Sequence, residues 1–182
     1  ARLAGMKDEE CLMMEIAGNL HDVGKLAVPN EILEKPGKLT DEEFNIVKEH
    51  PYYTRLILMD VDGFERIANW AGFHHEKLNG NGYPFHLAAE QLDLGARIMA
   101  VADIFSAITE VRPYRAGMAR EQAVAVLKGN VEAGMTAKGC YMPQHGVKRQ
   151  RGHYLLTRYK RTQRHATAKG LCKADYIGSD AI

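Results

Sequence analysis

The sequence has no apolar run close to the roughly 18 residues that a membrane-spanning helix needs, so we expect no membrane segment in it. It is also poor in cysteine. Cys11, Cys140 and Cys172 are an odd number at long spacings, and no CxxC pair exists. This spacing argues against a zinc knuckle and against a disulfide framework. The sequence therefore favours a protein of the reducing cytoplasm.

Sustained alternation of apolar and polar residues is absent as well, which argues against β-strands. Apolar residues recur instead at helical spacing, and the sequence predicts an all-α fold with a helical-bundle core. We expect Asp8 to cap the first helix and Pro51 to break or kink the helix that reaches His50. The expected helices cover 9–21, a segment that begins at the capping box Thr40–Glu43, 52–59, 63–72, 93–109 and 119–128, with a loop over 74–84.

Charge divides the chain unevenly. Residues 1–137 hold 14 Lys and Arg against 21 Asp and Glu, whereas residues 138–182 hold 10 and 2. We therefore expect one domain over 1–130 and a basic, partly helical tail over 131–182, with a helix near 150–168. A solvated or partner-facing tail is one interpretation and a nucleic-acid-binding tail is the other. Because the tail has no nucleic-acid motif, we expect no nucleic-acid partner.

Histidines and aspartates in a particular order are the most informative feature of the sequence. Asp103 interrupts the apolar run 98–105, where a charge is costly unless it is paired or binds a metal. The neighbours His74 and His75 can converge on one site only at a helix end or in a loop. All are nitrogen or carboxylate ligands suited to iron, manganese or zinc. A single histidine at a helix end is more often a surface or capping residue, but the order of these residues together is hard to explain by chance and makes them candidate metal ligands: His21, Asp22, His50, His74, His75 and Asp103.

Three stretches carry a family resemblance. They are HDVGKLAVPNEILEKPGKLTDEEF (21–44), HHEKLNGNGYP (74–84) and ARIMAVADIFSAITEVRPYR (96–115). They resemble the HD-GYP class of the HD metal-dependent phosphohydrolase superfamily over roughly residues 1–130. The resemblance implies an all-α helical bundle of the HD-domain type.

The resemblance also implies two divalent metal ions, with iron or manganese expected and zinc or nickel compatible with the ligands. His21, Asp22 and Asp103 would hold one ion, and Asp22, His50, His74 and His75 the other. A carboxylate suits the bridging position of Asp22 because each of its oxygens can bind one ion. Ions roughly 3.5–4 Å apart can share a hydroxide that attacks phosphorus.

Substrate contacts follow from the same resemblance. Lys25 would approach the phosphate and stabilise its developing charge; the alternative is a solvent-exposed lysine. Arg112 and Arg115 would contact phosphates or guanines, although Arg112 could instead pair with Glu110. Tyr83 either stacks on a base or packs in its loop.

The GYP loop, Gly82-Tyr83-Pro84, would shape the pocket and face diguanylate cyclase domains as partners. Gly80 and Gly82 would allow unusual backbone angles, and Glu76 could orient a histidine.

The sequence departs from the family pattern at two places. The family has a further ligand histidine in an upstream helix, whereas no histidine precedes His21. We therefore expect the sequence to be a piece of a longer protein that carries a regulatory domain. We do not expect His145, His153 or His165 to substitute for that ligand. Position 106 is Ser where many members have Asp, which affects a substrate contact rather than a metal ligand.

The resemblance implies a phosphodiesterase that hydrolyses cyclic di-GMP to pGpG, to GMP or to both, by attack of a metal-activated hydroxide. The alternative is a catalytically degenerate module in bacterial signalling that senses a nucleotide or docks a cyclase. A third interpretation is an HD enzyme for another nucleotide, against which the GYP tripeptide argues. A homodimer is compatible with each of them.

Overall fold

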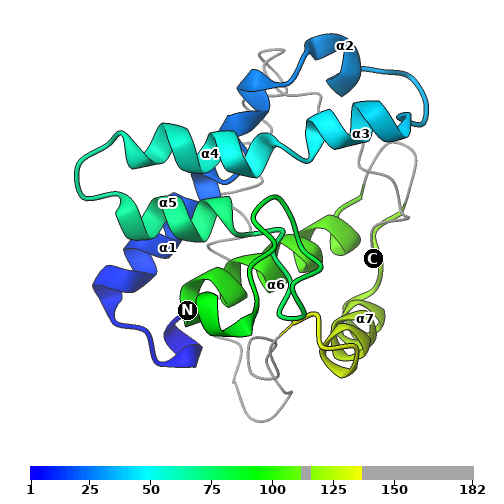
Figure 1. Cartoon of the computed structure of the whole chain (residues 1–182). Coiled ribbons are helices and arrows are strands. Elements are labelled where there is room, and N and C mark those ends of the chain that lie inside the picture. Colours follow the sequence, from blue (N-terminus) through cyan, green and yellow to red (C-terminus); the bar gives the residue numbers. More distant parts are fainter. Residues whose placement is uncertain (112–115, 137–182) are drawn as a thin grey trace.

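The computed structural model describes residues 1–111 and 116–136, and the regular elements within these ranges are helices. They contain no β-strand, only an isolated antiparallel bridge between Asn79 and Ala88. The all-α prediction is therefore confirmed (Figure 1). In chain order the elements are η1 (Arg2–Ala4), α1 (Asp8–Leu20), η2 (Val23–Ala27), α2 (Asn30–Leu33), α3 (Asp41–Val47), α4 (His50–Met59), α5 (Glu65–Gly72), η3 (Ala89–Gln91), α6 (Leu94–Thr109) and α7 (Arg120–Glu132).

Helix starts follow local sequence in most places. The predicted capping box is present: the hydroxyl of Thr40 accepts from the Glu43 amide, and the Glu43 carboxylate accepts from the Thr40 amide. The prediction for α1 was off by one residue, because Lys7 occupies the cap and Asp8 is the first helical residue. The acid still lies in the first turn, where it favours the positive end of the helix dipole.

The prediction that Pro51 breaks the helix reaching His50 was wrong. Helix α3 already ends at Val47, and α4 begins at His50 with Pro51 in its first turn. Proline costs little there because the first amides of a helix have no intrahelical acceptor. His50 therefore opens a helix rather than closing one.

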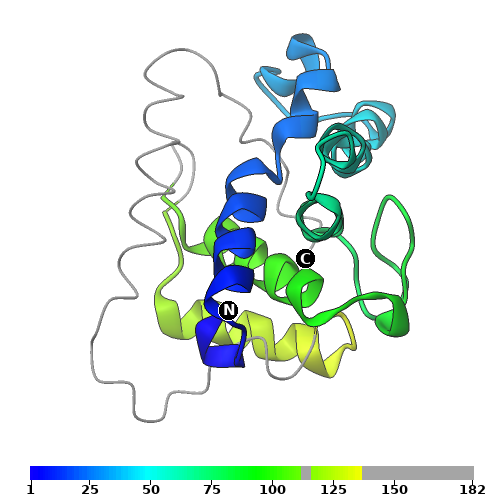
Figure 2. The same ribbon diagram turned by 90° about the vertical axis from the view of Figure 1, so that its left-hand side faces the viewer.

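Helix α4 lies beside α5, and α5 packs in turn against α1 and α6, while α7 covers a further side of α6 (Figures 1 and 2). Trp70 of α5 is central to this packing and is 1% exposed. Its indole N–H donates to the carboxylate of Asp93, which also caps α6. The buried core cluster comprises Ala17, Leu58, Ile67, Ala68, Trp70, Ala71, Leu92, Ala96 and Met99.

Several predictions concern residues beyond these ranges. Of the tail predicted over 131–182, residues 137–182 lie outside the described residues, together with the helix expected over 150–168, Cys140 and Cys172. The domain boundary at residue 130 stays a prediction. None of the helices in the described part of the chain is both long and apolar enough to cross a bilayer.

Candidate metal centre

The six predicted ligands come together from four parts of the fold. His21 and Asp22 lie between α1 and η2, His50 opens α4, His74 and His75 follow α5, and Asp103 lies inside α6. The ring centroids of His74 and His75 are 4.1 Å apart, and those of His21 and His74 are 4.9 Å apart. His50 and His74 are 0% and 1% exposed. The bundle thus buries a dense group of imidazoles.

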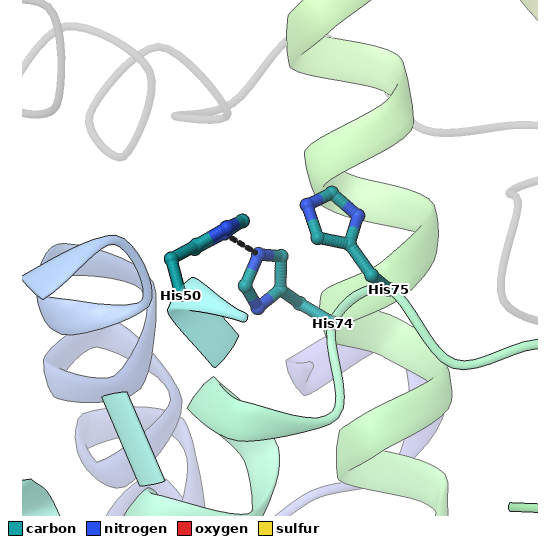
Figure 3. Close-up of side chains that lie close together, drawn as sticks. All are labelled: His50, His74 and His75. Atoms are coloured by element: carbon teal, nitrogen blue, oxygen red, sulfur yellow. Dashed lines mark hydrogen bonds between the residues drawn. The ribbon is translucent and has the colours of Figure 1, made fainter. Parts of the chain in front are cut away.

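Among residues 1–111 and 116–136, two sets of three side chains could each hold a metal ion, with ligand atoms that lie within 4.8 Å of one another. One set is His50, His74 and His75; the other is His21, Asp22 and His74. Figure 3 shows the three rings of the first set, with His50 and His74 facing each other through Nε2 atoms 3.3 Å apart.

The two carboxylates each face two different histidines. Asp22 places Oδ2 3.4 Å from His21 Nε2 and Oδ1 3.3 Å from His50 Nε2. Asp103 places Oδ1 3.6 Å from His21 Nε2 and Oδ2 3.9 Å from His75 Nδ1. Each carboxylate thus offers its two oxygens to different imidazoles, and each could hold a metal ion together with them.

Backbone carbonyls fix the tautomers of three rings. The Nδ1 atoms of His21, His50 and His74 lie 2.8, 2.7 and 2.6 Å from carbonyl oxygens three residues earlier, at helix C-termini whose carbonyls lack intrahelical donors. A carbonyl only accepts, so each Nδ1 donates, and the Nε2 of a ring in its neutral form keeps a lone pair. In neutral His50 and His74 the two Nε2 lone pairs, 3.3 Å apart, would repel each other unless a proton or a metal ion lies between them. This donor set therefore fits a metal ion.

The protonation states of the cluster follow from burial and charge. Burial lowers the pKa of His74 well below its usual value and that of His75 to about 4, so both rings are neutral. Burial opposes ionisation of Asp22, but His21 and Lys25 hold its pKa well below the ordinary range. Burial likewise opposes charge on His21, yet Asp22 and Asp103 raise its pKa to about 9. Neutral His74 and His75 beside ionised carboxylates match a divalent cation, whereas His21 is protonated in the metal-free protein and would have to release a proton to bind one.

Thr54 of α4 fixes the turn that carries His21, Asp22 and Gly24 through two hydrogen bonds. This role was not identified from the sequence. The Thr54 hydroxyl accepts from the Gly24 amide at 2.9 Å and donates to the His21 carbonyl at 2.7 Å. Gly24 packs so tightly that a Cβ there would meet the His50 carbonyl and the Thr54 amide. Glycine two residues after the His-Asp pair was the available sequence signal, since it marks a close backbone approach.

Lys25 lies inside the cluster. Its ammonium is 3.0 Å from Asp22 Oδ2, and its side chain is 16% exposed. The alternative of a solvent-exposed lysine therefore does not hold, whereas a phosphate contact stays a prediction. Arg112 and Arg115 lie outside the described residues, as do His145, His153 and His165.

The GYP loop packs directly on His75, one of the candidate metal ligands. The Tyr83 ring lies 4.7 Å from the His75 ring at an interplanar angle of 31°, and its backbone N–H donates to the His75 carbonyl. Tyr83 is thus packed in its loop, and a base contact stays a prediction. Gly80 has a positive φ of 75°, as expected of an unusual backbone angle. Gly82 is not among the glycines with a positive φ, and glycine is required there because a Cβ would meet the backbone of Glu76 and Lys77.

Glu76 also differs from expectation. We expected it to orient a histidine, but its carboxylate oxygens accept from the backbone amides of Phe85 and Leu87 at 2.7 and 2.9 Å. The side chain is 3% exposed. Its described hydrogen bonds therefore hold the loop.

Comparisons with known proteins agree with this architecture. A 3'3'-cGAMP-specific phosphodiesterase of Vibrio cholerae is 43% identical over 131 residues, which are 72% of this chain and 28% of that protein. A cyclic di-GMP phosphodiesterase of Pseudomonas aeruginosa is 47% identical over 110 residues, 60% of this chain and 27% of its own. A cyclic di-GMP phosphodiesterase response regulator of Xanthomonas campestris pv. campestris is 40% identical over 129 residues, 70% and 34% of the two chains.

The chain therefore spans about three tenths of the length of the curated relatives that it matches. The family model of the HD domain matches residues 1–134, which include every candidate ligand in the cluster. The helical bundle, the order of the ligands and this match lead to one conclusion: the chain belongs to the HD-domain family of phosphohydrolases.

Proposed function

We propose that this domain is a metal-dependent phosphodiesterase that hydrolyses a cyclic dinucleotide, with cyclic di-GMP as the first candidate and pGpG, GMP or both as products. The observation that carries the proposal is the meeting of His50 and His74, whose Nε2 atoms lie 3.3 Å apart, with a carboxylate oxygen of Asp22 3.3 Å from His50 Nε2. The names of its relatives support the substrate class, since they act on cyclic di-GMP and on 3'3'-cGAMP.

We assign His21, Asp22 and Asp103 to one divalent ion and Asp22, His50, His74 and His75 to a second. His74 is close enough to both groups to serve either. Iron or manganese suits this mixed set of nitrogen and oxygen ligands, and zinc or nickel is compatible with it. Bound ions of this kind lower the pKa of water towards 7 and offset phosphate charge.

The protein's own residues orient the ligands and balance charge. Asp22 and Asp103 are both ionised, so by themselves they would repel a phosphodiester. The ammonium of Lys25 offsets part of that charge on the side of Asp22, and we assign to it a contact with a phosphoryl oxygen of the substrate. Arg112, Arg115 and Tyr83 complete the proposed substrate contacts.

A direct assay tests this function. The purified chain, loaded with Mn²⁺ or Fe²⁺, is incubated separately with cyclic di-GMP and 3'3'-cGAMP, and the products are separated by chromatography. We expect linear dinucleotide or mononucleotide from the wild type and none from the His21→Ala, Asp22→Ala double variant. Asp62→Ala, an exposed carboxylate in the loop between α4 and α5, is the matched control and should retain activity.

A catalytically degenerate module is the second candidate, because position 106 is Ser where many members of the family have Asp. It predicts nucleotide binding without turnover in the metal-loaded wild type. Docking of a diguanylate cyclase on the GYP loop, a homodimer and a cytoplasmic location stay predictions. The first two are tested by size-exclusion chromatography of the chain alone and with a cyclase domain.

A further inference from the structure

The loop that follows the histidine pair is held closed by one buried carboxylate. Glu76 accepts from the amides of Phe85 and Leu87, one on each oxygen, although it is 9 and 11 residues away in the chain. Hydrogen bonds to an ionised acceptor are stronger than neutral ones. A burial of 97% removes competing water, so these two bonds tie the start of the loop to its end.

Two further contacts support this closure. The Phe85 ring lies 5.5 Å from Phe73 and 6.1 Å from Tyr52, with the Arg55 guanidinium 5.8 Å from its centroid. Gly82 lies so close to the backbone of Glu76 that no side chain would fit there. The loop is thus anchored at its end on α4 and folded back in its middle on its own beginning.

The part of the loop between the anchors carries Tyr83. Its ring covers the face of His75, and its backbone N–H is bonded to the His75 carbonyl 3.2 Å away. His75 has no Nδ1 bond to a carbonyl three residues earlier among the described contacts, unlike His21, His50 and His74. The tyrosine ring therefore restrains an imidazole that lacks that support.

We propose that Glu76 is a positioning residue, which closes the GYP loop and thereby holds Tyr83 against His75, so that the imidazole keeps its place in the cluster. The claim that Glu76 keeps Tyr83 against His75 concerns the metal-free protein. The consequence for metal affinity rests on the proposed function.

The test is the Glu76→Gln variant, studied first without metal. Glutamine keeps the shape but offers one acceptor oxygen, and its amide nitrogen cannot accept the second backbone N–H. The NMR signals of the His75 ring carbons and hydrogens report on the tyrosine ring above it through the ring-current shift. The Tyr83→Leu variant gives the reference value with no ring present.

We expect Glu76→Gln to lose most of the ring-current shift at His75 and to speed hydrogen exchange at the Phe85 and Leu87 amides. With metal, we expect the Kd for Mn²⁺ to rise about 10-fold or more, the effect typical of outer-shell residues. Glu90→Gln, an exposed glutamate of η3 at the end of the same loop, is the control and should change neither quantity.

A His75 ring-current shift equal to that of the wild type in a folded Glu76→Gln variant would overturn the proposal, whatever the melting temperature does. If Glu76→Gln does not fold, the Glu76→Asp variant is measured in its place. Aspartate keeps both acceptor oxygens but is one methylene shorter, so we expect a His75 ring-current shift between those of the wild type and Tyr83→Leu. Rapid exchange of the Phe85 and Leu87 amides in the wild type would also overturn it. Because these readouts need no metal, absence of metal binding in the wild type counts against the proposed function alone.

Discussion

Thr54→Val is the most informative single substitution for the architecture of the site. Valine has the shape of threonine, but it can neither accept from the Gly24 amide nor donate to the His21 carbonyl. Thr54 is 0% exposed and α4 closes over the turn, so water cannot easily replace the hydroxyl.

The magnitude follows from the two groups that lose their partner. Each buried backbone group without a hydrogen bond costs about 1–3 kcal/mol, so Thr54→Val should lower the free energy of unfolding by about 2–6 kcal/mol. Thr54→Ser keeps both bonds and removes one methyl, for about 1 kcal/mol. Urea denaturation of the wild type and the two variants measures the difference.

The same pair of variants separates stability from function. We expect the Kd for Mn²⁺ to rise in Thr54→Val and to stay near the wild-type value in Thr54→Ser, because the hydroxyl fixes the carbonyl of a proposed ligand. A Thr54→Val protein as stable as Thr54→Ser would show that the hydroxyl does not hold the turn.

Two further predictions concern packing and metal binding. Gly95→Ala should lower the free energy of unfolding by about 1–3 kcal/mol because the new methyl would meet the Trp70 indole. Gly129→Ala, in an exposed part of α7 with open space at its Cβ, should raise that free energy by about 0.5–1 kcal/mol. Thermal denaturation in which Gly95→Ala is more stable than Gly129→Ala would contradict the packing described for these two glycines. Mn²⁺ at 100 times the Kd of each of the two proposed sites should add about 5.4 kcal/mol of stability, about 2.7 kcal/mol per site, reversed by EDTA, and no change in melting temperature would argue against a metal site.

The elements that the sequence predicted well are those determined by local residues. Helix α6 was expected over 93–109 and covers Leu94–Thr109, since Asp93 caps it and an apolar run follows. The Thr40–Glu43 capping box marked the start of α3 for the same reason. The candidate ligands were identified from their order and family resemblance, and the fold brings all six together.

The features that the sequence did not reveal depend on partners far along the chain. Thr54 contacts a turn 30 residues earlier, and nothing in its own neighbourhood marks that contact. Glu76 was assigned to a histidine because it follows two of them, but its carboxylate turns towards amides 9 and 11 residues later. Proline can either end a helix or open one, and local sequence does not separate the two roles. Pro51 was therefore expected to break a helix although it lies in the first turn of one.

Metal stoichiometry tests the central claim most directly. The wild-type chain and the His21→Ala, Asp22→Ala double variant are loaded with Mn²⁺ under identical conditions, freed of excess ion and analysed by elemental mass spectrometry. The account predicts about two ions per wild-type chain and a clear loss in the double variant, which would also show that a histidine upstream of His21 is dispensable. One ion or none in the wild type, or equal metal content in the two proteins, would contradict the two-ion centre proposed for these six residues.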